Sequence, residues 1–144
     1  MIKLKKKILS CRSKIFVRFS EVDSLGIVWH GNYIKYFEDG REAFGKQFQF
    51  TYWDVFEKGY ITPIVKTLCE YKKPLMYGDT AIIETTFVDM AAAKLIFEYK
   101  MYRECNDELI ATGSTTQIFL DSNKQLMLTV PPFFEKWKKK NGLR

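Results

Sequence analysis

The sequence predicts an α+β fold in which an antiparallel β-sheet packs against one long helix. Residues 32–48 carry a helical pattern of apolar side chains, and only strand-like segments joined by short turns follow over most of the remaining chain. A strand succession without intervening helices favours antiparallel pairing over the βαβ units of a parallel sheet. With 144 residues, 47% of them hydrophobic, the chain is long enough for a single domain with a real core.

The long helix is indicated by an aromatic stripe whose members recur at intervals of three or four residues. Charged side chains fall largely on the other faces, as expected of a helix that buries one side. Asn32 is expected to be the N-cap, because an asparagine side chain can satisfy a free N–H of the first turn. The stripe consists of Tyr33, Phe37, Gly40, Phe44 and Phe48.

The strands are predicted from β-forming residues and alternating polarity, bounded by turn residues. One strand is expected before the helix, and a short helical turn over residues 53–58 should end at Gly59. Proline at position 131 favours the start of a terminal helix over residues 131–140. The predicted strands are residues 13–19, 60–72, 80–88, 95–102 and 108–120, with a short extended piece at 126–128.

The net charge of +6 is concentrated at the two ends of the chain. Residues 1–18 and 136–144 carry twelve basic and no acidic residues, whereas residues 19–135 carry eleven basic and seventeen acidic ones. Residues 1–12 and 136–144 are therefore expected to be flexible basic tails. Because the body is acidic, nucleic acid is not an expected partner.

No apolar run reaches the length that a membrane span requires, and the apolar stretch after the first lysines is too short for a signal peptide. We therefore expect a cytoplasmic protein without membrane insertion. Cys11, Cys69 and Cys105 are widely spaced and form no Cys/His cluster, which favours reduced thiols and no metal site.

An acid-bearing loop leads directly into the long helix. Asp23 stands in the turn-forming sequence Asp-Ser-Leu-Gly, and His30, the single histidine, and Gly31 come just before the helix. The free N–H groups of a first helical turn attract negative charge, so this arrangement can serve chemistry. Two plainer interpretations stay open: Asp23 could only cap its own turn, and His30 could be an ordinary rim histidine.

The spaced set D-x-x-G-I-V-x-H-x-N-Y, followed by an aromatic helix and a meander of strands, resembles the hot-dog-fold thioesterases of the 4-hydroxybenzoyl-CoA thioesterase type. Within them it is most similar to the branch that includes the Tol-Pal-associated thioesterase. The resemblance covers about residues 13–135 and implies one hot-dog domain, an antiparallel sheet wrapped around a central helix. Its specific residues are Asp23, Gly26, Val28, His30 and Tyr33, with Glu38, Arg41, Tyr71, Pro74 and Asp79 in support.

The resemblance implies hydrolysis of an acyl-CoA thioester to a free acid and coenzyme A. Asp23 would be the catalytic carboxylate, either as nucleophile or as general base, and the residues do not decide between these roles. The main-chain N–H groups of His30 and Gly31 would form the oxyanion hole. An additional role of the His30 imidazole stays open.

Substrate contacts are expected from Tyr33, Lys72, Lys73 and Lys94. Relatives often carry an arginine for coenzyme A phosphates in the loop that reads Met-Ala-Ala-Ala here, at residues 90–93, so the lysines are the expected replacements. The chain also has Gly40 where relatives commonly carry alanine, which weakens a helix unless a neighbour packs there.

The resemblance further implies no metal and no cofactor other than the coenzyme A of the substrate. It implies a homodimer or homotetramer with active sites between subunits. Two alternatives to an acyl-CoA thioesterase stay open: an acyl-carrier-protein thioesterase, and a non-catalytic hot-dog module that binds acyl groups or coenzyme A.

Overall fold

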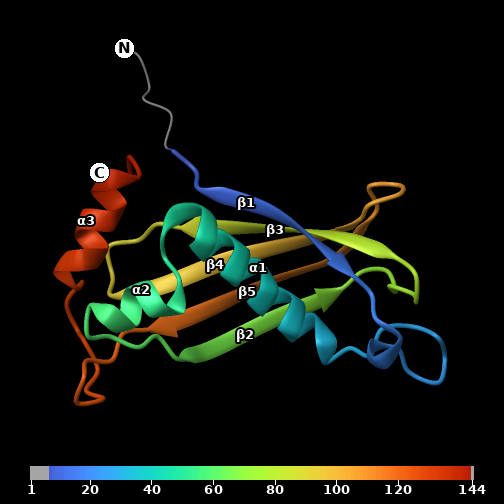
Figure 1. Ribbon diagram of the computed structural model, residues 1–144, viewed down its shortest axis with the longest axis horizontal. Helices are drawn as coiled ribbons and strands as arrows, with labels where there is room; N and C mark the ends of the chain where they lie inside the picture. Colours follow the sequence, from blue (N-terminus) through green and yellow to red (C-terminus); the bar gives the residue numbers. More distant parts are fainter. Residues whose placement is uncertain (1–6, 144) are drawn as a thin grey trace, which may run out of the picture.

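A computed structural model describes residues 7–143, and its centre is a five-stranded sheet in the order β1-β3-β4-β5-β2 (Figure 1). All neighbouring strands pair antiparallel, which confirms the predicted α+β class. The order leaves β1 and β2 as the two edges of the sheet. The strands are β1 (Ser10–Phe16), β2 (Ile64–Tyr71), β3 (Thr80–Val88), β4 (Lys94–Arg103) and β5 (Leu109–Ile118).

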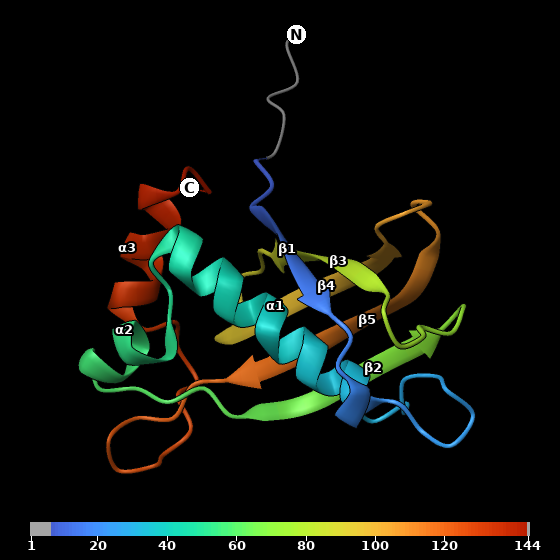
Figure 2. The ribbon, with the colours of Figure 1, turned by 45° about the vertical axis from the view of Figure 1, so that its right-hand side comes forward.

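The long helix α1 (Asn32–Phe48) lies across one face of this sheet (Figures 1 and 2). The predicted aromatic stripe is its buried side, to which Tyr36 is added, and Phe37 and Phe44 are fully buried. Phe37 stacks on Tyr99 of β4 with ring centroids 4.4 Å apart. Burial of this stripe, more than helix propensity, fixes α1 on the sheet.

Gly40 lies where α1 packs closely on β3. A Cβ atom at this position would lie 2.4 Å from Thr85 Oγ1 and 3.0 Å from Ile83 Cδ1. The helix therefore has a glycine at this point because alanine would not fit, although glycine is the poorer helix former. This close packing accounts for the departure from alanine that the sequence shows.

Two short helices cover the end of the sheet opposite the start of α1 (Figure 2). They are α2 (Tyr52–Glu57), which begins with a capping box between Thr51 and Asp54, and α3 (Pro132–Lys140). Trp137 of α3 packs against Phe87 at 5.2 Å between centroids and donates a hydrogen bond from Nε1 to the Phe48 carbonyl at 2.8 Å. The aromatic cluster at this end holds the terminal helix on the domain.

Several predicted boundaries are wrong. The strands expected at residues 60–72 and 108–120 are shorter, at Ile64–Tyr71 and Leu109–Ile118. The N-cap of α1 is Gly31, and Asn32 is the first helical residue, because its side chain donates to the Glu21 carbonyl at 2.9 Å instead of capping the turn. The first strand is β1, not residues 13–19, because its pairing with β3 already ends at Phe16, after which a single 3₁₀ turn, Phe19–Glu21, leads into the acid-bearing loop.

Part of each basic end belongs to a regular element of the fold. Residues 10–12 belong to β1, and residues 136–140 belong to α3; residues 1–6 and 144 lie outside the described residues. Lys138 is fully buried and pairs with Asp89 Oδ1 at 2.9 Å, while Nζ also donates to the Met90 carbonyl. None of the helices in residues 7–143 combines the length and apolarity needed to cross a bilayer.

Candidate active site

A cleft of about 310 Å³ lies at the N-terminal end of α1, where the acid-bearing loop meets the end of β2. Both ribbon views show this loop beside the C-terminal end of β2 (Figures 1 and 2). The cleft brings together five of the residues that the sequence singles out for the site: Asp23, His30, Tyr33, Lys72 and Lys73. Its other lining residues are Ile27, Val28, Tyr71 and Pro74.

Asp23 both holds a tight turn and lines the cleft. Its N–H donates to the Ile27 carbonyl at 2.8 Å, and its own carbonyl accepts from Gly26, whose φ of 78° suits glycine. Its Oδ1 accepts from the Leu25 N–H at 2.8 Å, which is the turn-capping role that the sequence left open. The residues that the structure describes provide no hydrogen-bond partner for Oδ2, so one carboxylate oxygen is left for chemistry.

The start of α1 presents main-chain donors to the same region. The Trp29 N–H donates to the Glu21 carbonyl at 2.9 Å, and the Asn32 N–H donates to the Trp29 carbonyl at 2.9 Å. Between them, the N–H groups of His30 and Gly31 find no hydrogen-bond acceptor within residues 7–143. The N–H groups at the start of a helix point out of its N-terminal end, where the helix dipole favours negative charge.

Gly31 leaves room for the ring of Trp29. A Cβ atom at position 31 would lie 2.2 Å from Cζ3 of that ring. The glycine therefore lets the indole cover the start of the helix. Gly31 itself is not among the lining residues of the cleft, which it adjoins through His30.

Tyr71 is a member of the cleft to which the sequence assigned no chemistry. Its hydroxyl donates to the His30 carbonyl at 2.8 Å, and its ring meets the Tyr33 ring at 4.9 Å. Burial raises the pKa of Tyr71 to about 12, so the phenol keeps its proton at neutral pH. Tyr71 thus fixes the peptide unit that carries the Gly31 N–H, although only the resemblance drew attention to this residue.

The His30 imidazole lies at the rim of the cleft. The side chain is exposed, and its ring contacts the rings of Trp29 at 5.0 Å and Tyr71 at 6.4 Å. Within the described residues no hydrogen bond joins it to Asp23. The main chain of His30 is therefore better placed for a role in the site than its side chain.

The three lysines predicted to contact substrate do not lie together. Lys72 and Lys73 are exposed at the cleft, and Lys72 Nζ pairs with Glu70 Oε2 at 3.0 Å. Lys94 is opposite Ile118 at the start of β4, at the end of the sheet remote from Tyr71, which is opposite Ala111. One copy of the chain therefore does not bring Lys94 to the cleft.

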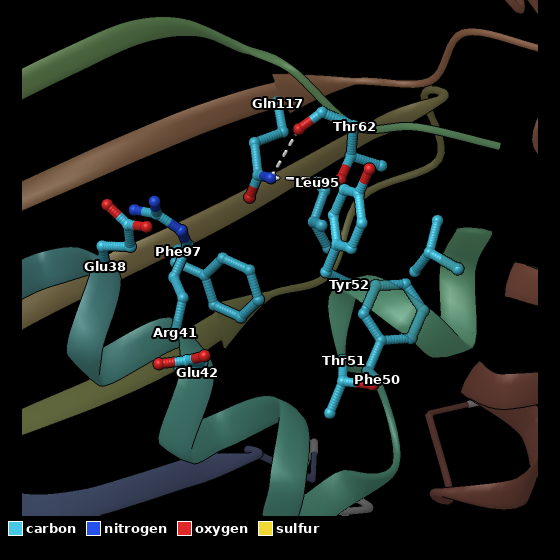
Figure 3. A pocket seen from close by; sticks show the side chains of 11 residues that line it. Glu38, Arg41, Glu42, Phe50, Thr51, Tyr52, Thr62, Leu95, Phe97 and Gln117 are labelled. Carbon is cyan, nitrogen blue, oxygen red and sulfur yellow. Dashed lines mark hydrogen bonds between the residues drawn. The ribbon is translucent and has the colours of Figure 1, made fainter.

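A second cavity, of about 270 Å³, lies between α1, α2 and the strand ends at the other end of the molecule (Figure 3). Sequence patterns gave no sign of it, since its lining comes from segments far apart in the chain. Arg41, a supporting residue of the resemblance, donates from Nη1 to the Tyr99 hydroxyl at 3.0 Å. The lining residues are Glu38, Arg41, Glu42, Phe50, Thr51, Tyr52, Val55, Thr62, Leu95, Phe97 and Gln117.

Neither cavity has the ligand set of a metal site. In the part of the chain that the structure describes, no three His, Cys, Asp or Glu side chains lie together as metal ligands would. Cys11, Cys69 and Cys105 are free thiols. The chemistry that the described residues offer the cleft is that of a carboxylate and main-chain amides.

A five-stranded antiparallel sheet that packs on one central helix is the arrangement of the hot-dog fold. A family model described as the thioesterase-like superfamily matches residues 17–138, and the chain belongs to this superfamily. This membership confirms the predicted hot-dog fold and the predicted class of enzyme, the thioester hydrolases.

Known proteins extend this likeness over most of the chain. YneP of Bacillus subtilis, provisionally named as an acyl-CoA thioesterase, is 34% identical over 88% of this chain and 91% of its own length. The structure of DHNA-CoA thioesterase from Staphylococcus aureus is 25% identical, covers 91% of this chain and 89% of that chain, and has a TM-score of 0.81. A structure of 4-hydroxybenzoyl-CoA thioesterase, 20% identical over 90% of this chain and 98% of that chain with a TM-score of 0.78, shares the fold.

Proposed function

We propose that this chain hydrolyses acyl-CoA thioesters, with Asp23 as the catalytic carboxylate. One observation carries the proposal: Asp23 and His30 line the same cleft, and in the described residues neither the Oδ2 of Asp23 nor the N–H groups of His30 and the adjoining Gly31 have a hydrogen-bond partner. The provisional name of YneP and the name of the staphylococcal enzyme support coenzyme A as the carrier. The motif at residues 23–33 further favours the 4-hydroxybenzoyl-CoA type, in the Tol-Pal-associated branch.

The chemistry follows from these groups. The Asp23 carboxylate either attacks the thioester carbon and forms an anhydride, which water then hydrolyses, or takes a proton from a water molecule that attacks. In both routes the thioester oxygen gains negative charge, and the His30 and Gly31 N–H groups stabilise it. One such donor typically contributes about 3 kcal/mol to the transition state. Coenzyme A then leaves as a thiolate and takes up a proton.

The exposed lysines give the cleft a place for the phosphates of coenzyme A. Lys72 and Lys73 lie at its lining, and Tyr33 forms part of its buried wall. Lys94 would complete the set only from a second copy of the chain. We expect no metal and no further cofactor, and a cytoplasmic location without nucleic acid or membrane insertion as partners.

A second copy is expected at the exposed edge of the sheet. β2 has an unpaired edge, and Val65 and Leu68 are more than half exposed on it. Unpaired strand edges pair readily with another chain, and a twofold axis through the middle of β2 would join two sheets antiparallel. Such a pairing gives the homodimer that the resemblance implies, and two dimers could form a homotetramer.

The proposal is tested by measuring thiol release from matched acyl-CoA and acyl-carrier-protein thioesters. We expect turnover of acyl-CoAs with multiple cycles per active site. Turnover confined to the carrier-protein substrates would instead support an acyl-carrier-protein thioesterase. Saturable binding of acyl-CoA without any cleavage would contradict the enzymatic proposal and favour a binding module.

A further inference from the structure

Arg103 places a largely buried guanidinium next to the wall of the cleft. The residue ends β4, and its side chain is only 15% exposed. Its nitrogens have three different partners: Nη2 donates to the Pro74 carbonyl, Nε to Asp79 Oδ2 at 3.3 Å, and Nη1 to Glu108 Oε1 at 3.0 Å. Of these partners, Pro74 lines the cleft. The planar fork of an arginine suits such a set of acceptors, which a single ammonium group does not match.

Pro74 and Asp79 bound a segment, residues 74–79, that leads from the cleft to β3. Asp79 Oδ2 also accepts the Met76 N–H at 2.9 Å, and the Asp79 N–H donates to the Met76 carbonyl at 3.0 Å. These two hydrogen bonds close the far end of the segment into a turn. Arg103 therefore holds the segment at both ends, at the Pro74 carbonyl and at the Asp79 carboxylate.

The same segment is hydrogen-bonded to the acid-bearing loop. The Val28 N–H donates to the Leu75 carbonyl at 2.8 Å, and Ile27 forms an antiparallel bridge with Met76. The Ile27 carbonyl in turn accepts the Asp23 N–H at 2.8 Å. A shift of the segment would therefore be passed on to the turn that holds Asp23.

The contact to Arg103 lies one carbonyl away from the one that Val28 uses. Leu75 is fully buried, so its side chain anchors the segment in the core. An apolar side chain holds a segment in place without fixing the direction of its carbonyls, whereas a hydrogen bond fixes that direction. By holding the Pro74 carbonyl, Arg103 orients the peptide unit that leads to the Leu75 carbonyl.

The two lysines at the cleft are held separately. The N–H groups of Lys72 and Lys73 both donate to the Ile110 carbonyl, at 2.8 and 3.0 Å. Loss of the Arg103 side chain would therefore leave their main chain in place. Each nitrogen of the guanidinium already has an acceptor within the protein, so Arg103 is not counted among the contacts to coenzyme A phosphates.

We infer that Arg103 is a positioning residue of the candidate active site: it ties segment 74–79 to the end of β4 and thereby holds the turn of Asp23. This inference rests on the proposed function, in which the Asp23 carboxylate reacts. Small displacements of a reacting group slow the chemical step strongly. The contact to Glu108 is not needed for this role, because a main-chain hydrogen bond from the Arg103 N–H to the Glu108 carbonyl, at 2.9 Å, already closes that hairpin.

Arg103→Met tests this role, because it keeps an unbranched apolar stem and removes the guanidinium. In steady-state thiol release we expect kcat to fall at least about tenfold with KM within about threefold. Amide hydrogen exchange, followed residue by residue by NMR, should be at least about tenfold faster at the Val28 N–H, beyond any change shared by amides in the middle of β4 and β5. Those strand amides report global unfolding, so the comparison separates positioning from a general loss of stability.

Two further variants complete the test. Arg103→Met combined with Asp79→Asn removes both charges, so that no carboxylate loses its partner, and an asparagine can still accept the Met76 N–H. This double variant should show the same losses as Arg103→Met, and it carries both readouts if the single variant does not fold. Glu108→Ala is the matched control, because it removes a partner of the same guanidinium outside the segment. It should leave kcat and the exchange of the Val28 N–H unchanged.

The inference would be overturned by a wild-type kcat in folded Arg103→Met, or by exchange at Val28 that only follows the strand amides. Recovery of kcat in the double variant would also overturn it, because the loss would then come from the stranded Asp79 charge. A raised KM with kcat preserved would place Arg103 in substrate binding and likewise contradict it. A wild type that cleaves no acyl-CoA would instead contradict the proposed function, and the exchange comparison would still decide whether Arg103 holds the loop.

Discussion

Asp23 uses its two carboxylate oxygens for different purposes. Oδ1 accepts the Leu25 N–H and holds the turn, whereas Oδ2 has no partner in the described chain. The turn-capping interpretation and the catalytic interpretation are therefore compatible in one side chain. The turn also explains how a loop residue can be placed firmly enough for chemistry, since three hydrogen bonds fix it.

Tyr71→Phe removes only the hydroxyl that donates to the His30 carbonyl. We expect kcat to fall about threefold to tenfold with KM within about twofold, because one hydrogen bond of about 1 kcal/mol no longer fixes the peptide that carries the Gly31 N–H. Steady-state thiol release measures both constants. Since the pKa of Tyr71 is raised to about 12, the pH profile below pH 10 should keep its shape.

Tyr77→Phe is the control for this change, because Tyr77 is exposed and packs on Phe19 outside the cleft. It should leave both constants unchanged. An increase in KM with kcat preserved in Tyr71→Phe would show that Tyr71 contacts substrate instead of positioning the main chain.

At the residue scale, sequence patterns predicted the site residues that lie close together in the chain. Asp23, His30 and Gly31 belong to one loop, so a spacing motif could link them, and Lys72 and Lys73 follow the strand that ends beside it. The contact between Arg41 and Tyr99 and the one between Gln117 and Thr62 depend on how the sheet is ordered. No local pattern carries that information.

Helix α1 shows how packing decides over propensity. Gly40 costs helix stability in isolation, yet it allows α1 to approach Thr85 and Ile83 of β3. The helix position in turn sets where its first turn meets the acid-bearing loop. The candidate active site therefore depends on contacts well away from it.

Gly40→Ala should destabilise the fold by about 1–3 kcal/mol, because the added methyl group overpacks the contact with Thr85. Urea unfolding of wild type and variant measures the difference. Lys35→Ala, on the exposed side of the same helix, should change the free energy of unfolding by less than about 0.5 kcal/mol. If Gly40→Ala is instead stabilised, helix propensity outweighs packing at this position.

The hydrophobic periodicity of the sequence predicted which helices and strands form, but it did not predict all of their ends. The predicted limits of α1, residues 32–48, agree with the structure because the aromatic stripe is long and regular. The N-cap differs because Asn32 finds the Glu21 carbonyl, eleven residues earlier. β1 begins earlier than predicted because Ser10 and Cys11, which belong to the predicted basic tail, pair with β3.

On the scale of the whole molecule, the cleft and the second cavity lie toward opposite ends of the edge strand β2. Tyr71, at one end of β2, lines the cleft, and Thr62, just before the other end, lines the second cavity. The exposed edge of β2 is the expected contact between copies. Because Lys94 lies remote from the cleft of its own copy, the complete set of predicted substrate contacts is expected to require the dimer.

Leu68→Glu tests this requirement. Leu68 lies near the middle of β2 and is 52% exposed, so a twofold pairing would bring two added carboxylates together. We expect a monomer with at least about tenfold lower kcat/KM, measured by light scattering after size exclusion and by thiol release. Thr116→Glu adds the same charge on β5, away from the edge, and should leave both unchanged. A fully active monomer of Leu68→Glu would contradict the shared site.

The most direct measurement is the single-turnover rate of thioester cleavage by Asp23→Asn with enzyme in excess over acyl-CoA. Asparagine can still accept the Leu25 N–H, so the turn should persist while the reacting carboxylate is lost. Asp121→Asn is the matched control, since Asp121 also caps a turn, through Asn123 and Gln125, and lies outside the cleft. The account predicts at least about a hundredfold slower cleavage by Asp23→Asn and a wild-type rate for Asp121→Asn. Equal rates for Asp23→Asn and wild type would contradict it.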